Sequence, residues 1–208
     1  YFDVHEVAEN PNLYFFDMKN PLADRVLALW PPMDPALFNA YSAVRDIPVS
    51  FVGQVSAYRR SRKQYIDYLR SEKIPCYLST DDRRNQKLSH AEYADILKRS
   101  RISLNFSYSV SCHQFKGRAI EVMLCGAMLL ESENDQTSRL FSPMEDYVPF
   151  SSKTDMVDKI RYYLSHEDEL KTIADRGRKK AESCYGYYQF WKILFSRLNL
   201  NCIQSDNL

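Results

Sequence analysis

Apolar residues from position 48 onwards fall into short runs that alternate with segments of helical periodicity. The runs predict strands at residues 48–53, 75–79, 102–106, 127–131 and 147–150. The segments between and after them predict helices at residues 62–72, 89–99, 116–124, 154–164, 167–183 and 187–198. Because parallel strands are joined by crossover helices, this alternation predicts an α/β fold: a Rossmann-like parallel sheet with helices on both faces.

Two serines mark predicted helix starts. Ser89 precedes Glu92 by three residues, which is the S-x-x-E capping box, so a helix is expected to begin there. Ser165 stands just before the acidic start of segment 167–183 and is predicted to be the N-cap of that helix.

The chain before residue 48 follows a different pattern. Residues 1–20 are aromatic-rich and mixed and predict no element, whereas residues 23–30 (ADRVLALW) predict a short buried strand. Three prolines between 31 and 35, with an aspartate before the last of them, are breaker and turn signals. This stretch is interpreted as a linker between two domains.

Composition narrows the function classes. The 208 residues suffice for one or two domains with a buried core, and a net charge of +1 with scattered Lys and Arg argues against a nucleic-acid partner. No apolar run reaches the about 20 residues that span a bilayer, so no transmembrane segment is expected. The five cysteines form no CxxC pair, which favours free thiols in a reducing compartment, the cytoplasm, over disulfides or a zinc site.

Glycine usage limits how this protein could bind phosphate. No two of its five glycines are spaced as in GxGxxG or GxxxxGK[ST], so the dinucleotide fingerprint and the P-loop are both excluded. Any phosphate must be bound by cations and a helix N-terminus. The densest group of cations, at residues 59–63, is either a solvated helix start or an anion-binding group.

Segment 116–121 (KGRAIE) combines the features that a phosphate site requires. A helix N-terminus carries unpaired N–H groups, Gly117 lets an anion approach them, and Lys116 and Arg118 add full charges. Glu121 lies one turn deeper, where a carboxylate can accept two hydrogen bonds from a ribose diol. Phosphate and diol contacts one turn apart predict a nucleotide site. Alternatively, Arg118 and Glu121 simply pair with each other at i, i+3 on the helix surface.

With these residues the chain resembles the C-terminal, nucleotide-sugar-binding domain of GT-B glycosyltransferases, specifically the group 1 and spore-maturation-type proteins. The resemblance rests on FVG at 51–53, LNFS at 104–107, KGRAIE at 116–121, LCG at 124–126 and MLLES at 128–132. It implies three parts: residues 1–40 as the remnant of an N-terminal domain with the hinge, 41–185 as the Rossmann-like donor-binding domain, and 186–208 as a C-terminal helix. The hinge of these enzymes usually ends in D-x-x-x-F, here Asp34 to Phe38.

The resemblance also implies roles for individual residues. It implies a nucleotide-sugar site formed by Gly53, Arg59, Arg62, Lys116, Gly117, Arg118 and Glu121. In it, Glu121 holds the donor ribose, and Lys116 and Arg118 hold the pyrophosphate.

Two positions depart from the family pattern. Retaining relatives carry a second glutamate eight residues before the ribose glutamate; here that position is His113, which is either the catalytic contact to the sugar or a surface residue. Many relatives have an arginine after the glycine of the first strand, where this chain has Gln54, and Arg59 or Arg62 could compensate.

The function that the resemblance implies is sugar transfer from a nucleotide-sugar donor to a carbohydrate, lipid or protein acceptor, with retention of configuration. Cations and a helix dipole would neutralise the leaving group, so neither a cofactor nor a metal is expected. The acceptor groove of such enzymes belongs to the N-terminal domain, most of which is expected to be missing here. Nucleotide, sugar, acceptor and oligomeric state cannot be inferred from the sequence.

Two other classes compete with this interpretation. A noncatalytic Rossmann-like scaffold or interaction module is favoured by His113 and Gln54. A receiver-like signalling domain would use Asp81 and Asp82 as its acidic pair, but it also needs a phosphoacceptor aspartate after the middle strand, and LNFSYS at 104–109 has none.

Overall fold

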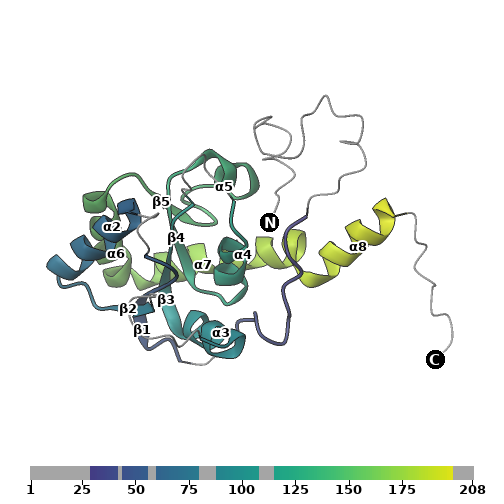
Figure 1. Ribbon diagram of the computed structural model, residues 1–208, viewed down its shortest axis with the longest axis horizontal. Helices are drawn as coiled ribbons and strands as arrows, with labels where there is room; N and C mark the ends of the chain where they lie inside the picture. Colours follow the sequence, from purple (N-terminus) through teal and green to yellow (C-terminus); the bar gives the residue numbers. More distant parts are fainter. Residues whose placement is uncertain (1–28, 42–43, 56–59, 80–87, 108–114, 199–208) are drawn as a thin grey trace.

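The computed structural model describes residues 29–41, 44–55, 60–79, 88–107 and 115–198 (Figure 1). The strands are β1 (Ile47–Val52), β2 (Cys76–Ser79), β3 (Ser100–Asn105), β4 (Met128–Ser132) and β5 (Val148–Phe150). The helices are α2 (Arg60–Ser71), α3 (His90–Arg99), α4 (Gly117–Leu124), α5 (Asp135–Leu140), α6 (Lys153–Ser165), α7 (Glu167–Tyr185) and α8 (Tyr187–Arg197). Every predicted element from residue 48 onwards is present, whereas α5 was not predicted. The strand predicted at 23–30 lies almost entirely outside the described residues.

The five strands form one parallel sheet in the order β2-β1-β3-β4-β5. The predicted fold class, a Rossmann-like α/β sheet, is therefore confirmed. The chain moves outward from β1 to β2 and then returns past β1 to β3, so the connections diverge at the carboxyl ends of β1 and β3. Ligands of open α/β sheets bind at such a switch point.

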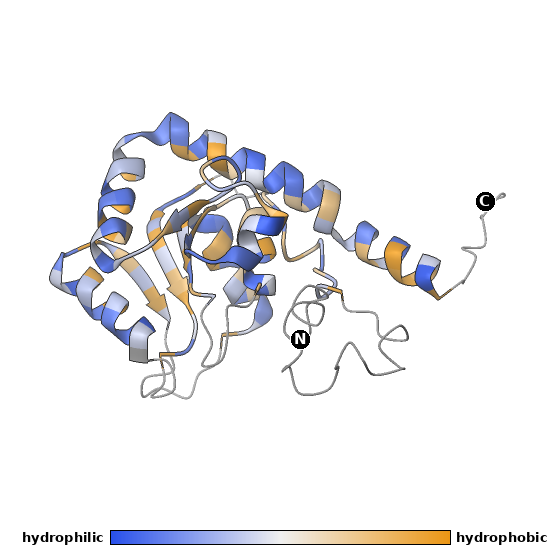
Figure 2. Cartoon of the chain, turned by 90° about the horizontal axis from the view of Figure 1, so that it is seen from above, coloured by the Kyte–Doolittle hydropathy of each residue, from blue (hydrophilic) through white to orange (hydrophobic). Residues whose placement is uncertain are grey.

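Helices cover both faces of the sheet, as the near-continuous apolar strands require (Figures 1 and 2). On one face, strand residues such as Phe51 and Leu104 pack with residues of α2 and α6. On the other face, α4 buries its apolar stripe, Ala119 to Cys125, with Leu97 of α3 and Leu129 of β4. This second face carries α4 and therefore determines where its N-terminus lies.

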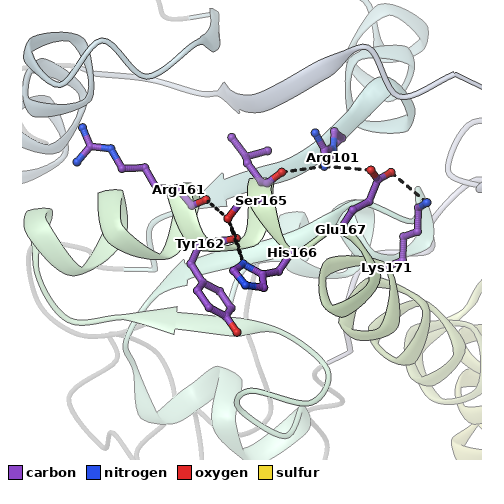
Figure 3. Close-up of polar contacts among 8 residues, drawn as sticks. Arg101, Arg161, Tyr162, Ser165, His166, Glu167 and Lys171 are labelled. Carbon is purple, nitrogen blue, oxygen red and sulfur yellow. Dashed lines mark hydrogen bonds and ion pairs between the residues drawn. The ribbon is translucent and has the colours of Figure 1, made fainter.

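Ser165 is not the N-cap of α7, as predicted, but the last residue of α6. Its hydroxyl donates to carbonyl groups of its own helix, including Tyr162 O at 2.8 Å, and His166 takes the N-cap position without a side-chain cap (Figure 3). Arg101, at the start of β3, donates to Leu164 O at 3.3 Å. The α6–α7 corner is thus tied to the amino edge of the sheet, opposite the strand ends where a ligand is expected.

Arg45 connects three other carbonyl groups near the amino edge. Its Nη1 donates to Lys98 O at 2.9 Å and to Ser100 O at 2.7 Å, and its Nη2 donates to Cys125 O at 2.9 Å. These carbonyls lie at the C-terminal ends of α3 and α4, where no following helical turn supplies N–H donors to them. One side chain from the segment before β1 therefore closes the ends of two helices.

Helix α8 extends away from the sheet in both views (Figures 1 and 2), and none of its residues is fully buried. Its aromatic residues include the exposed Tyr187 and Tyr188. In the part of the chain that the structure describes, no helix is both long and apolar enough to cross a membrane.

Gly177, in the middle of α7, lies against the backbone of the segment before β5. A Cβ at this position would come within 2.3 Å of Asp146 O. Alanine usually favours a helix over glycine by about 1 kcal/mol, but here the clash should reverse the sign. We expect Gly177→Ala to lower the free energy of unfolding by roughly 1–3 kcal/mol, measured by urea denaturation. Ser183→Ala, at an exposed position of the same helix, is the control, and an unchanged Gly177→Ala variant would contradict this packing.

Candidate functional site

The candidate site lies where the carboxyl ends of β1, β3 and β4 meet the N-terminus of α4. Gly53 follows β1 directly and donates its N–H to Ser79 O at 2.9 Å. Ser107 follows β3, and its N–H donates to Ser132 Oγ, at the end of β4, at 3.0 Å. These hydrogen bonds fix the ends of neighbouring strands relative to one another, and α4 begins beside them.

The N-terminus of α4 has no side-chain cap. Lys116 occupies the N-cap position without a cap hydrogen bond, and no acidic residue lies in the first turn. The helix nevertheless stays in place because it buries five of its eight residues, including Ala119, Ile120 and Val122. Ala119 N–H donates to Lys116 O at 2.9 Å, whereas the structure shows no such hydrogen bond within the described residues for the amides of Gly117 and Arg118. The helix dipole adds positive potential at this end.

Gly117 also has a packing role. The space that its Cβ would fill is already taken by Pro31 Cγ and Met33 Cε, each 3.2 Å from that position. The linker segment therefore packs on the first turn of α4 because residue 117 is glycine. The predicted close approach of an anion at Gly117 stays a prediction.

Arg118 lies over Gly53. A Cβ on Gly53 would come within 2.9 Å of Arg118 Nη1 and 3.3 Å of Nη2, so the glycine leaves room for the guanidinium. Arg118 forms no ion pair with any described residue, and its buried Nε has no hydrogen-bond partner there. A guanidinium without an ion pair, one residue inside a helix start that has no side-chain cap, is suited to a phosphate.

Glu121 does not pair with Arg118 at the helix surface, the alternative that the spacing left open. Its Oε2 instead accepts a hydrogen bond from Tyr93 Oη, on α3, at 2.7 Å. Burial raises the pKa of Glu121, whereas the Tyr93 hydrogen bond and the charge of Arg118 lower it. Burial also raises the pKa of Tyr93, so this phenol keeps its proton and remains a donor.

Glu131, in β4, is a fully buried carboxylate near the same helix start. Its Oε1 accepts hydrogen bonds from Asn105 Nδ2 at 2.8 Å and from Ser107 Oγ, whereas Oε2 has no hydrogen-bond partner in the described structure. Burial raises the pKa of Glu131 to about 7, against the lowering effects of the Ser107 and Asn105 hydrogen bonds and the charge of Lys116. A carboxyl group whose pKa lies near neutrality is therefore buried close to the start of α4.

Arg62 has a structural role that the sequence did not predict. It is 3% exposed, and it donates from Nη1 to Gln54 O at 2.8 Å and from Nη2 to Phe106 O at 3.2 Å. Its guanidinium carbon lies 5.5 Å from the ring centroids of both Phe51 and Phe106. Arg62 thus connects the loops after β1 and β3, and this placement does not support the predicted phosphate contact.

Two predicted site residues, the catalytic candidate His113 and the cation Arg59, lie outside the described residues. The structure brings together Gly53, Lys116, Gly117, Arg118 and Glu121. Within the described part of the chain, no group of three or more His, Cys, Asp or Glu side chains is arranged to hold a metal ion. The expectation of metal independence stays a prediction.

Sequence reasoning missed Tyr93 and Glu131. Glu131 could have been noticed as a carboxylate inside an apolar strand, a place where a charge needs buried donors. Tyr93 had no such signal, because its partner on α4 is 28 residues away.

The fold is that of the C-terminal domains of GT-B group 1 glycosyltransferases. The sequence profile of the glycosyl transferase-like family matches residues 36–195, and the chain belongs to this family. No curated protein sequence matches it.

Solved structures show the same fold. The C-terminal domain of the group 1 glycosyl transferase LpcC from Francisella tularensis superposes with a TM-score of 0.57 at 12% identity, covering 74% of this chain and 98% of that domain. HepE from Anabaena, in complex with UDP-glucose, gives a TM-score of 0.63 at 10% identity, and sucrose-phosphate synthase from Thermosynechococcus elongatus gives 0.59 at 16%. These two matches cover 85% and 84% of this chain but only 58% and 56% of theirs. At these identities the likeness shows the fold alone.

Glu131 should make stability depend on pH. Its folded-state pKa of about 7 lies above its ordinary value of 4.5, so the folded protein binds this proton more readily than the unfolded chain. Its destabilising effect is therefore full above pH 7 and disappears as pH falls towards 4.5. Glu131→Gln keeps an acceptor oxygen and removes the charge. We expect this variant to exceed the wild type in unfolding free energy by up to about 3 kcal/mol at pH 8, and to match it near pH 4.5.

The measurement is urea denaturation at both pH values. Glu133→Gln, which changes an exposed carboxylate two residues away, is the matched control and should not alter the pH dependence. A Glu131→Gln variant that is less stable than the wild type at pH 8 would show that the buried charge stabilises the fold.

Proposed function

We propose that this chain is the donor-binding domain of a glycosyltransferase that transfers a sugar, with retention of configuration, from a nucleotide-sugar to an acceptor. The observation that carries the proposal is the pairing of two groups on adjacent turns of α4. Arg118 lies over Gly53 without an ion pair to any described residue, and Glu121 has one carboxylate oxygen fixed by Tyr93. A diphosphate at the first group and a ribose diol at the second make up a nucleoside diphosphate.

The position of the site supports the same ligand. It lies at the switch point of the sheet, beyond the carboxyl ends of β1 and β3, where open α/β sheets bind nucleotides. HepE, which shares the fold, is described in complex with UDP-glucose, with UDP and glucose, and with UDP. We extend that ligand class to this chain as a proposal.

The proposed chemistry is electrostatic. Departure of a nucleoside diphosphate leaves negative charge on its terminal phosphate, and Lys116, Arg118 and the start of α4 place positive charge near it before the bond breaks. These groups supply the charge that a bound metal supplies in other transferases, so the proposal includes neither metal nor cofactor. His113 is the candidate for the contact with the sugar.

The acceptor is proposed to bind between this domain and an N-terminal domain, the remainder of the longer enzymes that share the fold. It is a carbohydrate, lipid or protein hydroxyl, which must be positioned against the sugar carbon by groups outside this domain. A cytoplasmic location is part of the proposal, and the free thiols of Cys76, Cys125 and Cys184 are compatible with a reducing compartment.

Nucleotide binding is the first test. Thermal unfolding with UDP, GDP, ADP, CMP and the corresponding nucleotide sugars should show stabilisation by one nucleotide, about 2.7 kcal/mol at 100 times its dissociation constant. Arg118→Gln and Glu121→Gln should each weaken binding about tenfold or more, because each removes a charge-assisted hydrogen bond. Arg176→Gln, at an exposed cation on α7, is the control and should bind like the wild type. No stabilisation by any of these ligands, in a folded protein, would favour the scaffold interpretation.

Metal independence is tested separately by isothermal titration calorimetry with the nucleotide that binds. We expect the dissociation constant in 5 mM EDTA to stay within about twofold of its value in Mg²⁺ or Mn²⁺, because protein cations already balance the diphosphate. Binding that disappears in EDTA and returns with a divalent ion would contradict this part of the proposal and leave the nucleotide site itself intact.

A further inference from the structure

We propose that Tyr93 is a positioning residue of this site. Its phenol fixes the Glu121 carboxylate so that Oε1 remains available to both hydroxyls of a ribose diol. This inference rests on the proposed function, because it specifies how the same site distinguishes a ribonucleotide from an analogue without hydroxyls.

The hydrogen bond gives the two carboxylate oxygens different roles. Tyr93 Oη donates to Glu121 Oε2 at 2.7 Å, whereas no described residue donates to Oε1. Glu121 is only partly buried, so part of this residue is open to solvent. A carboxylate with one oxygen bound and the other open has a defined orientation, and a defined orientation improves binding to a rigid pair of hydroxyls.

Tyr93 is itself held in place from two sides. It lies in the first turn of α3, whose start is fixed by the Ser89–Glu92 capping box, with Ser89 N–H donating to Glu92 Oε2 at 2.8 Å. The ring of Phe38 packs edge-on against the Tyr93 ring, with centroids 6.1 Å apart and planes at 70°. Phe38 ends the linker segment, so this contact places the linker directly behind the residue that orients Glu121.

The phenol also affects the protonation of Glu121. Burial favours the neutral acid and so raises its pKa, and three groups oppose this: Tyr93 and His90 on α3 and Arg118 on α4. A neutral carboxyl presents one acceptor fewer and one donor more, and therefore matches two diol hydroxyls less well. Loss of the Tyr93 hydroxyl should thus shift the acid limb of ligand binding to higher pH.

Tyr93→Phe tests the inference, because it removes one hydroxyl and keeps the ring that packs against Phe38. The matched control is Tyr162→Phe. Tyr162 Oη also donates to a carboxylate, Glu169 Oε1, at 3.0 Å, but it lies at the α6–α7 corner on the opposite edge of the sheet (Figure 3). Any general effect of losing a phenol–carboxylate hydrogen bond should appear in both variants.

The ligands are UDP, GDP, ADP and CDP and the 2′,3′-dideoxy form of whichever binds, measured by isothermal titration calorimetry from pH 5 to pH 8. In Tyr93→Phe we expect binding of the ribonucleotide to weaken at least fivefold and binding of its dideoxy form to change less than twofold. The acid limb of the pH profile should shift upward. Tyr162→Phe should match the wild type in all three respects.

The outcomes separate the two proposals. If no nucleoside diphosphate binds the wild type, the proposed function fails and the role of Tyr93 fails with it. If the wild type prefers the ribonucleotide and Tyr93→Phe shows the same preference and pH profile, only the role of Tyr93 is overturned. Phe38→Leu is the second variant: it keeps the hydroxyl and loosens the ring, and it should weaken ribonucleotide binding less than Tyr93→Phe without shifting the pH profile.

Discussion

A carboxylate without water must be surrounded by donors or neutralised, and this constraint shapes the centre of the molecule. Asn105 and Glu131 are register partners in β3 and β4, and their side chains are joined by a hydrogen bond at the carboxyl end of the sheet. Ser107 adds a second donor and simultaneously ties its backbone to the end of β4. The neighbouring strands β3 and β4 therefore end at the same height in the sheet, and the start of α4 lies beside their ends. The arrangement of the candidate site follows from it.

Arg62 and Arg118 both lie near the end of β1, but their burial and local partners give them different roles. Arg62 directs both Nη groups to backbone carbonyls and lies between aromatic rings, so these two groups are engaged within the protein. Arg118 reaches the same strand end, but there it lies over Gly53, which has no side chain to pair with it. A cation without an ion pair to any described residue, in a partly buried place, favours an anionic partner. Sequence spacing made both arginines candidates; only their surroundings separate them.

The fold could be predicted in large part because four of its five strands, all but the edge strand β2, are mostly buried and contain short apolar runs. Helix α5 was missed because it has six residues and buries only Thr137, so no apolar stripe marks it. Ser165 misled because a serine can equally bond back to the preceding turn, as it does here. In the site, KGRAIE at 116–121 could be found because its groups lie within one stretch of chain. Tyr93 could not, because its role arises only when α3 packs against α4.

Arg45 sets a lower limit on how short this domain can be made. Its guanidinium donates hydrogen bonds to the carbonyl groups of Lys98, Ser100 and Cys125, which lie 53 to 80 residues further along the chain. A fragment that begins at β1 would retain every strand of the sheet and every helix described around it, but it would lose the Arg45 side chain. Three partly buried carbonyls would then be left without their donor, at the ends of the helix that orients the phenol and the helix that carries the cations. The folding unit therefore begins upstream of its first strand, in a segment without regular secondary structure.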